Sequence, residues 1–530
     1  MPINDLYQRL AAHPDRRLRV FSVDGSLVTR TFAEVHADVL GLMSELRAGG
    51  VGAGDRVGIL GPNSYEWAVA DLALLGLGCV SVALPGQRRV RPEDTGELSD
   101  RYGLSALLIT RAVPAGIPLP PAAAVLEDRP LRLRTRQPAA DGRPPLPPDV
   151  FSIAFSSGTS GTRKGLMMTR DGVANTIRTS GQAWAVTGED NILIVMPFSS
   201  FQQRYLLYTA IWFGADATVV APERLFQKLG TFGPTIILGP PSFFEIVVNR
   251  VRAAGLRARL PWYAAALLHG IAPGRATVRL RARLCQGWTS VYGSRVRLML
   301  TGSAPVPPRL VTFFQQLGAP LFEVYGSTEV GWISFNLPGR QRIGTAGRPV
   351  DGVEVTIADD GEIVVRTEHP QAAGYVFEGE QTTQSVFLRG GRIATGDLGR
   401  FDRGFLRLVG RKKNVIITRS GVKINPEELE QAIEKDCRIT KAVVLSPAED
   451  GLLACVVWLD EWQSAVRTAE VESYVGDMNQ KRDSAHRVDR VVFRPDTELT
   501  VETGLLTRNL KVDRRAVMRE VFTGSGRAGR

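Results

Sequence analysis

The segment Ser-Ser-Gly-Thr-Ser-Gly-Thr-Arg-Lys-Gly, residues 156–165, is the most informative stretch of this chain. It combines hydroxyl side chains with three glycines and two cations, and an apolar strand is expected just before it over 150–155. Glycines let backbone N–H groups approach an anion, hydroxyls can donate to phosphate oxygens, and Arg163 and Lys164 can neutralise charge. The spacing is not GxxxxGK[ST], which argues against an ordinary P-loop ATPase. The segment therefore predicts a loop that binds a polyphosphate rather than a flexible linker.

The length and composition of the chain describe a folded protein with more than one domain. Its 530 residues exceed one ordinary hydrophobic core, and 44% apolar with 22% charged residues is typical of a globular protein. No run of 18 or more apolar residues is present, so no membrane span is expected. The N-terminus lacks a basic segment followed by an apolar one, so we expect no secretory signal and a cytoplasmic location.

The net charge of +11 comes mostly from arginine. Nucleic acid, a polyphosphate ligand or an acidic carrier protein could account for it. The basic residues are dispersed along the chain and carry no DNA- or RNA-binding signature, so no nucleic-acid partner is expected. A general preference for arginine explains the charge better than a binding role does.

The cysteines and histidines show no pattern of a metal site or a hydrolase. Cys79, Cys285, Cys437 and Cys455 form no CxxC pair, and none has a histidine at metal-ligand spacing. Each is expected to be a small core residue. The five histidines are equally scattered, which disfavours a zinc site and a Ser-His-Asp hydrolase.

The first part of the chain alternates between helical and strand patterns. Apolar residues at helical spacing predict helices over 31–46 and 65–77, and short apolar runs predict strands over 55–60 and 79–84. This alternation predicts a sheet covered by helices. Residues 113–148 are rich in proline and alanine and indicate a surface connection.

The last third of the chain has a different pattern. Residues 353–367 alternate with a period of two around a central Asp-Asp-Gly, which predicts a β-hairpin. A helix over 425–435 and strands over 441–445 and 452–459 follow. These elements predict a small α+β domain that begins near Gly410.

The segment at 156–165 resembles the phosphate-binding loop of the adenylate-forming superfamily, which includes acyl-CoA synthetases, luciferases and the adenylation domains of peptide synthetases. Further motifs follow in the superfamily's order, in the style of long-chain acyl-CoA synthetases, from about Thr31 to Arg515. The resemblance implies an α/β fold. We expect a large N-terminal domain of layered α/β sheets plus a β-barrel-like subdomain, with a small mobile α+β C-terminal domain, divided as 1–410 and 411–530.

The resemblance implies that the loop holds the β- and γ-phosphates of ATP. The residues matched to this role are Ser156, Ser157, Gly158, Thr159, Ser160, Gly161, Thr162 and Lys164. The motifs Thr-Gly-Ser-Ala-Pro at 301–305 and Tyr-Gly-Ser-Thr-Glu at 325–329 match the segments that bind adenine by backbone contacts and by aromatic stacking. Their matched residues are Gly302, Ser303, Ala304, Tyr325, Gly326 and Ser327.

The same resemblance assigns a metal ion and catalytic groups. Glu329 and Thr159 would hold Mg²⁺, a hard ion that prefers oxygen ligands, and Thr328 would contact the α-phosphate. Lys511, in Leu-Thr-Arg-Asn-Leu-Lys near the C-terminus, takes the position of the catalytic lysine and would bridge the substrate acid and the α-phosphate. Thr328, Glu329 and Lys511 are therefore the expected catalytic residues.

Two further motifs resemble the ribose site and the junction between the domains. Asp397, in Thr-Gly-Asp-Leu-Gly, would accept both ribose hydroxyls, and Arg411 would also reach the ribose. Lys413 matches the hinge about which the small domain turns. Residues 420–430 resemble the face that meets the pantetheine arm after that turn.

The expected substrate pocket departs from the family pattern. Long-chain acyl-CoA synthetases have a histidine where this chain has Ser200, and Gln203 replaces a usual glutamate, although Arg204 is kept. We expect Ser200, Phe201, Arg204 and Gly239 to line the pocket, with a floor more polar than a fatty acid prefers.

The sequence thus predicts an AMP-forming ligase that uses ATP to adenylate a small acidic substrate and releases pyrophosphate. A carboxylic acid passed to coenzyme A is favoured. Adenylation of nitrite with transfer to an aryl amine, and acyl transfer to a carrier protein or an amine, stay open. A catalytically inactive nucleotide-binding protein is disfavoured because Lys164, Glu329, Asp397 and Lys511 are all present.

Overall fold

The computed structural model describes most of the chain. The described residues are 3–22, 24–85, 99–110, 123–126, 145–155, 164–221, 224–272, 275–319, 321–418, 422–436, 438–447, 452–460, 462–500, 502–507 and 512–523. Residues 156–163 of the glycine-rich segment and Lys511 lie outside them.

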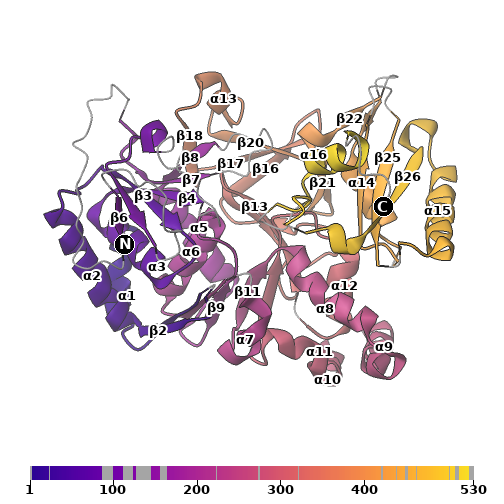
Figure 1. Ribbon diagram of the computed structural model, residues 1–530, viewed down its shortest axis with the longest axis horizontal. Helices are drawn as coiled ribbons and strands as arrows, with labels where there is room; N and C mark the ends of the chain where they lie inside the picture. The colour runs from indigo at the N-terminus through magenta and orange to yellow at the C-terminus, as the bar shows by residue number, and fades with distance from the viewer. Residues whose placement is uncertain are drawn as a thin grey trace.

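A seven-stranded sheet forms the first layer of the N-terminal part, in the order β18-β8-β7-β4-β3-β5-β6 (Figure 1). Its strands are β3 (Arg56–Gly61), β4 (Val80–Pro85), β5 (Ala106–Ile109), β6 (Ala123–Val125), β7 (Val150–Phe155), β8 (Gly165–Thr169) and β18 (Ala372–Val376). The predicted strands over 55–60 and 79–84 are confirmed. The predicted surface connection over 113–148 is wrong at β6, which extends the sheet beside β5.

A nine-stranded sheet forms the second layer, in the order β15-β14-β13-β12-β11-β9-β10-β1-β2. Its strands are β1 (Arg17–Phe21), β2 (Leu27–Thr31), β9 (Asn191–Ile194), β10 (Asp216–Val220), β11 (Ile236–Gly239), β12 (Leu298–Thr301), β13 (Leu321–Ser327), β14 (Gly331–Phe335) and β15 (Arg348–Pro349). Neighbours in the central part of the sheet pair in parallel, from β13 through β12, β11, β9 and β10 to β1. At the edges, β2 pairs antiparallel with β1, and β14 pairs antiparallel with β13 and with β15.

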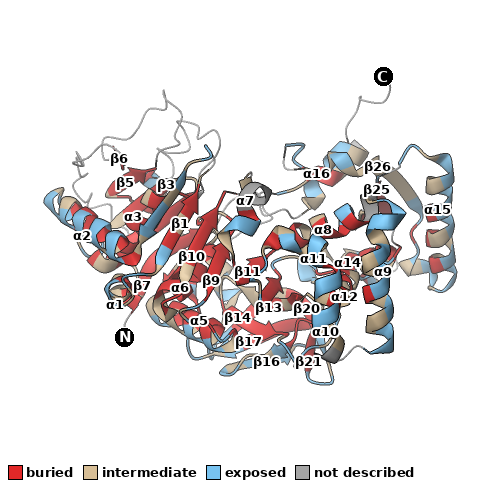
Figure 2. Ribbon diagram, turned by 90° about the horizontal axis from the view of Figure 1, so that it is seen from below, coloured by how far each residue is buried: buried red, intermediate tan, exposed pale blue. Residues whose placement is uncertain are grey.

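Helices pack between and beside these two sheets. They are α1 (Gln8–Ala12), α2 (Phe32–Ala48), α3 (Tyr65–Leu77), α5 (Arg170–Ala183) and α6 (Phe201–Phe213). The largest core cluster joins Trp67 of α3 to Ile59 of the first sheet and Ile194 of the second. Figure 2 shows buried residues along the strands of this core. The predicted helices over 31–46 and 65–77 are confirmed, and a capping box between Thr31 and Glu34 begins α2.

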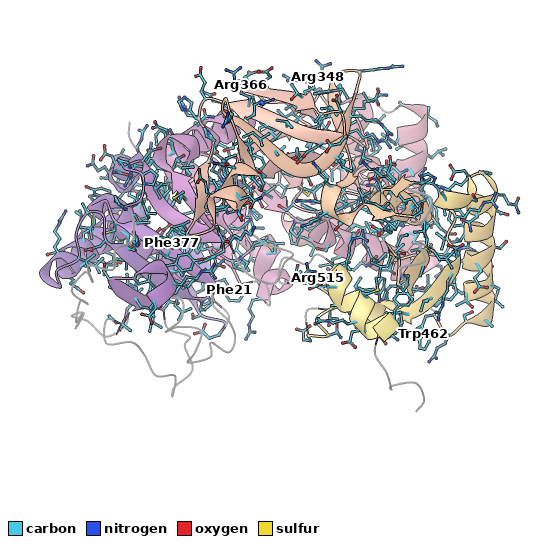
Figure 3. The ribbon with its side chains drawn as sticks, turned by 90° about the horizontal axis from the view of Figure 1, so that it is seen from above. Phe21, Arg348, Arg366, Phe377, Trp462 and Arg515 are labelled. Atoms are coloured by element: carbon cyan, nitrogen blue, oxygen red, sulfur yellow. The ribbon has the colours of Figure 1, made fainter. Side chains whose placement is uncertain are left out.

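A five-stranded antiparallel sheet follows, with its own core. It contains β16 (Val353–Ile357), β17 (Glu362–Thr367), β19 (Phe387–Leu388), β20 (Arg392–Asp402) and β21 (Phe405–Arg411), and α13 (Glu380–Gln384) precedes β19. The predicted hairpin over 353–367 is confirmed as the β16–β17 pair. Arg366 and Arg348 lie at its outer side, whereas Phe377, just after β18, lies among the N-terminal elements (Figure 3).

The C-terminal part packs around a three-stranded sheet. It contains α14 (Pro426–Ile433), β24 (Lys441–Leu445), β25 (Ala454–Leu459), α15 (Ala465–Gln480), β26 (Arg490–Pro495) and α16 (Arg514–Met518), preceded by the small pair β22 (Ile416–Ile417) and β23 (Lys423–Ile424). Separate hydrophobic clusters cover the two faces of the sheet. This part carries Trp462 and Arg515 and lies beside the five-stranded sheet (Figures 1 and 3).

A group of helices packs against the second sheet below the C-terminal part (Figure 1). They are α7 (Leu225–Phe232), α8 (Pro241–Ala253), α9 (Leu256–Ile271), α10 (Arg275–Leu284), α11 (Gln286–Thr289) and α12 (Pro308–Gln316). Among the described residues, no helix has the length and apolar character needed to cross a membrane.

Candidate active site

The predicted nucleotide motifs meet at the carboxyl ends of three neighbouring parallel strands. Gly239 at the end of β11 pairs with Thr301 of β12, which pairs in turn with Glu323 of β13. The residues that follow β12 and the end of β13 therefore lie side by side. Ligand sites of open α/β sheets form at this edge.

The first of these motifs has a backbone that few residues can adopt. A Cβ atom on Gly302 would come within 2.5 Å of the Val324 carbonyl oxygen, so only glycine fits there. Ser303 has a φ of 64°, in the left-handed region that non-glycine residues rarely occupy, and its hydroxyl donates to Gln202 Oε1 at 2.7 Å. Such strained positions cluster at binding sites. Ala304, the third predicted residue of this motif, follows directly.

The second motif is tied to the predicted ribose residue. Tyr325 is buried, and its hydroxyl donates to Asp397 Oδ2 at 2.7 Å. Arg411 Nε pairs with Asp397 Oδ1 at 2.5 Å from the neighbouring strand β21. Burial, followed by the charge of Asp397, raises the pKa of Tyr325 well above its ordinary value, so the phenol stays a donor. The structure thus brings Tyr325, Asp397 and Arg411 together.

The turn between β13 and β14 presents the remaining residues of this motif. A Cβ atom on Gly326 would lie 2.4 Å from the Gly331 carbonyl oxygen, and Val330 N donates to Ser327 Oγ at 3.2 Å. Thr328 is held through its carbonyl, which accepts from Gln371 Nε2 at 3.3 Å.

Lys164 and Glu329 are bridged by a residue that sequence reasoning missed. The Lys164 ammonium lies 5.4 Å from the centroid of the Tyr375 ring, within cation–π range. The Tyr375 hydroxyl donates to Glu329 Oε1 at 3.2 Å. Tyr375 lies on β18, which pairs with β8 directly after the glycine-rich segment. Because that pairing joins strands far apart in the chain, no local pattern indicates it.

The residues present fit a nucleotide and one magnesium ion. Thr301 Oγ1, buried at the end of β12, has no hydrogen-bond partner among the described residues. Glu329 retains Oε2 beyond the oxygen that Tyr375 contacts, and Mg²⁺ commonly uses one or two carboxylates together with phosphate oxygens. No group of three or more metal-ligating side chains occurs among the described residues.

Arg204 does not line a substrate pocket in this structure, which corrects the prediction. Its side chain is 1% exposed. Nε and one terminal nitrogen bind the Asp71 carboxylate, and the guanidinium also donates to Ser152 Oγ at 2.7 Å, Ser81 Oγ at 2.9 Å and Tyr208 OH at 3.1 Å. With its polar atoms engaged, Arg204 joins α6 to α3 and to β7, the strand that runs into the glycine-rich segment.

The other predicted pocket residues lie nearer the nucleotide motifs. Ser200 is half-buried at the start of α6, and Phe201 packs in the core with the Arg204 guanidinium 4.8 Å from its ring centroid. Gln203 is also buried, and its Oε1 accepts from Val195 N and Met196 N. Gly239 is buried at the end of β11. Of these, Ser200, Phe201 and Gly239 retain the predicted pocket role as a proposal.

The junction with the C-terminal part is held by charged contacts. Lys412 Nζ pairs with Asp360 at 2.7 Å and with Glu362 at 2.6 Å, directly before the predicted hinge residue Lys413. Desolvation, followed by the charge of Arg411, lowers the pKa of Lys413. From the other side, Arg309 of α12 donates to the carbonyl oxygens of Asp436, Ile439 and Thr440 at 3.2 to 3.4 Å. A boundary at 410 and a hinge at Lys413 stay predictions.

Part of the predicted site lies outside the described residues. These residues are Ser156, Ser157, Gly158, Thr159, Ser160, Gly161, Thr162 and Lys511. Their assigned roles stay predictions. Cys437 also lies outside the described residues, whereas Cys79, Cys285 and Cys455 are buried free thiols, as predicted.

Comparison with known families decides the class of the chain. The family model described as AMP-binding enzyme matches residues 6–380. The chain belongs to this family. This AMP-binding enzyme is 29% identical to the long-chain-fatty-acid–CoA ligase FadD15 of Mycobacterium bovis, over 95% of this chain and 93% of the relative. The predicted adenylate-forming superfamily is thereby confirmed.

Solved structures share the fold of this AMP-binding enzyme. The anthranilate CoA ligase AuaEII, in complex with anthranoyl-AMP, superposes with a TM-score of 0.75 at 20% identity, over 98% of this chain and 97% of the other. The O-succinylbenzoate CoA synthetase of Bacillus subtilis, with ATP and magnesium, gives 0.71 at 20% identity, over 99% and 100%. The predicted α/β fold is confirmed by these likenesses.

Proposed function

We propose that this AMP-binding enzyme is an ATP-dependent, AMP-forming acid–thiol ligase. It adenylates a carboxylic acid with release of pyrophosphate and transfers the acyl group to the thiol of coenzyme A. The observation that carries the proposal is the convergence of Lys164, Tyr375 and Glu329, which follows the end of β13, where Tyr325 is hydrogen-bonded to Asp397 of β20. The FadD15 relative, named as a coenzyme A ligase, supports the same class.

The chain's own residues position ATP in this proposal. Asp397 accepts the ribose hydroxyls while Tyr325 and Arg411 hold its carboxylate in place. The backbone at Gly302–Ala304 reads the adenine edge, and Lys164 neutralises the outer phosphates. Magnesium, when bound at Glu329, supplies charge neutralisation on the phosphate oxygens. Catalysis then rests on positioning and electrostatics.

Lys511 and the junction complete the proposal. In the first half-reaction a carboxylate oxygen attacks the α-phosphorus and pyrophosphate leaves, while Lys511 holds the attacking oxygen. In the second, the thiolate of coenzyme A attacks the acyl carbon and AMP leaves. A turn of the C-terminal part about Lys413 between the steps would break the contacts of Arg309 with residues 436–440.

The contacts of the predicted pocket residues support a carboxylic acid over nitrite. A polar floor was the reason to consider nitrite and an aryl amine. Arg204 and Gln203, however, direct their polar groups into buried networks rather than toward a substrate. Gln202 is engaged by Ser303. Among the described residues expected in the pocket, Ser200 remains as a polar departure from the family pattern. Transfer to an amine or a carrier-protein thiol stays a second possibility for the acceptor alone.

A pyrophosphate-release screen tests the proposal. Fatty acids, aryl acids, amino acids and nitrite would each be offered with ATP and magnesium, with and without coenzyme A and an aryl amine. We expect release that depends on a carboxylic acid and thioester formation only with coenzyme A. A Glu329→Gln variant keeps the shape of the side chain and should lose both. Release that requires nitrite plus amine, with no response to carboxylates, would contradict the proposal.

A further inference from the structure

The excess of positive over negative charge falls in one stretch of the chain. Residues 246–322 contain 11 arginines, no lysine and no aspartate or glutamate. The rest of the chain carries 54 Lys and Arg against 54 Asp and Glu, so this stretch accounts for the whole net charge of +11. Helices α9 and α10 form its centre. The excess charge is therefore local to one stretch of the chain, although 54 of the 65 Lys and Arg residues are dispersed outside it, as expected.

The same two helices hold many of the exposed apolar side chains. Among the described residues, fifteen large hydrophobic side chains are exposed, and seven of them lie on α9 and α10: Leu256, Leu260, Tyr263, Leu267, Ile271, Leu280 and Leu284. Those on α9 are between 44% and 73% exposed. Clusters of this kind mark interaction sites, whereas single exposed hydrophobic residues are common.

The α9 side chains form one stripe along the helix. They recur at i, i+4, i+7, i+11 and i+15, which at 3.6 residues per turn confines them to an arc of about 80°. Arg257 lies on one side of this arc and Arg259 on the other. The stripe faces away from the protein, because Ala265 and Trp262 on the opposite side pack into the neighbouring core beside α12.

Within the described residues, the exposed arginines of α9 and α10 lack carboxylate partners. Arg257, Arg279 and Arg283 are exposed, and among the described residues none of them forms an ion pair. Arg281 instead points inward, where it contacts His269 Nδ1 at 3.0 Å. Figure 1 places α9 and α10 at the lower edge of the molecule, and Figure 2 looks onto that edge and shows exposed residues along both helices. An apolar stripe between arginines thus faces outward, and of the two that flank it Arg259 donates to the Ala254 carbonyl oxygen at 2.7 Å.

We propose that α9 and α10 form a surface that binds the face of an anionic lipid bilayer. An interfacial helix buries an apolar stripe at the boundary between headgroups and acyl chains while flanking cations contact lipid phosphates. Leu260 and Leu267 supply the apolar centre, and Arg257, Arg279 and Arg283 supply the charge. A second copy of the chain fits less well, because a twofold contact would oppose arginines with no acidic residue in residues 246–322 to pair with them.

The surface is connected to the catalytic edge through the chain itself. Gly239 ends β11 at that edge, α8 begins at Pro241, and α9 follows after two residues. The chain thus passes from the catalytic edge to the proposed bilayer-binding surface through one helix, α8. The binding proposal does not depend on this link or on the identity of the acid, because it is measured without turnover.

Vesicle flotation with the full chain tests the surface. Vesicles of phosphatidylcholine alone would be compared with vesicles that also contain phosphatidylglycerol, at low and high salt. We expect binding to the anionic vesicles that weakens with salt. A Leu260→Glu/Leu267→Glu variant should bind them at least about tenfold more weakly. Val466→Glu, at a 70% exposed position on α15, is the matched control and should bind like wild type.

Further outcomes separate lipid from other occupants. Arg279→Gln/Arg283→Gln should reduce the preference for anionic vesicles while unfolding remains cooperative at an unchanged temperature, and Leu260→Ala/Leu267→Ala provides a milder test should the glutamates perturb folding. Absence of vesicle binding by the wild type, or equal binding by all variants, would overturn the proposal. Loss of a dimer in the glutamate variant, without vesicle binding by the wild type, would assign the stripe to a second copy instead.

Discussion

The hydroxyl of Tyr325 donates a 2.7 Å hydrogen bond to the carboxylate of Asp397, although 72 residues separate them in the chain. One residue belongs to the second sheet and the other to the five-stranded sheet. The contact therefore holds the proposed adenine and ribose residues in one arrangement before any ligand binds. Such preorganisation lowers the cost of ordering a site on binding.

Replacement of Tyr325 by phenylalanine should weaken ATP binding. The ring remains available for stacking, but Asp397 loses a buried donor, and hydrogen bonds to charged groups contribute about 1.5–3 kcal/mol. We expect KM for ATP in ATP–pyrophosphate exchange to rise by about tenfold or more, with a smaller change in kcat. Tyr292→Phe is the control, because that hydroxyl donates to Phe243 O in a different core. Equal effects of the two variants on KM would contradict the role of Tyr325.

Much of the fold was predictable because its signals are local. The helix over 65–77 has the predicted bounds, since Ser64 caps its start and Gly78 ends it in the left-handed conformation. The hairpin over 353–367 follows from alternation around one turn. The role of β6 was missed because a three-residue edge strand in a proline-rich stretch carries little pattern.

The sequence identified residues of the candidate site, but it did not indicate which of their side chains are in contact. Motifs identified Tyr325 and Asp397, but a motif does not say that the two side chains touch. Tyr375 was missed because only the pairing of β18 with β8 places it beside Lys164. Arg204 was wrongly assigned to the pocket because its helix gives no sign of which face meets a substrate. Helix α6 is buried on nearly every side, so its exposed and buried faces cannot be separated by periodicity.

Tyr375 should couple phosphate binding to metal binding. Tyr375→Phe keeps the ring beneath Lys164 and removes the donor to Glu329 Oε1. The magnesium concentration for half-maximal pyrophosphate exchange should therefore shift by several-fold, with KM for ATP changed less. Tyr375→Leu removes the ring as well and should raise both. The titration of exchange activity with magnesium distinguishes these effects. A phenylalanine variant with an unchanged magnesium requirement would show that the hydroxyl does not act on Glu329.

Arg204 should matter for stability rather than for choice of acid. Removing one partner of a buried ion pair costs about 3–5 kcal/mol, so Arg204→Ala should lower the free energy of unfolding by about that amount. Replacing both partners, as Arg204→Met with Asp71→Leu, should recover much of the loss. Chemical denaturation measures the change in the free energy of unfolding, and the acid screen measures any change in the choice of acid. A stable Arg204 variant with an altered acid preference would restore the pocket role that the structure denies it.

Glu323 should make the stability of the protein depend on pH. Burial raises the pKa of Glu323 to about 8, opposed in part by Arg407. The folded protein therefore keeps this proton at pH values where the unfolded chain, with an ordinary pKa near 4.5, has lost it. The stabilisation that Glu323 contributes is fully present below the pKa of the unfolded chain. It is lost as the pH rises through the pKa of Glu323 in the folded protein. Glu323→Gln should raise the melting temperature relative to wild type more at about pH 8.5 than at about pH 5. A difference independent of pH would contradict the shift.

The transfer of an oxygen atom tests the central claim most directly. In an adenylating ligase, a carboxylate oxygen bonds to the α-phosphorus, and attack of the thiol on the acyl carbon leaves that oxygen on AMP. The enzyme would be incubated with an ¹⁸O-labelled carboxylic acid, ATP, magnesium and coenzyme A, and the AMP would be analysed by mass spectrometry. We predict AMP that carries a single labelled oxygen, in an amount equal to the thioester. Unlabelled AMP, or label found only in inorganic phosphate, would contradict acyl-adenylate formation at this site.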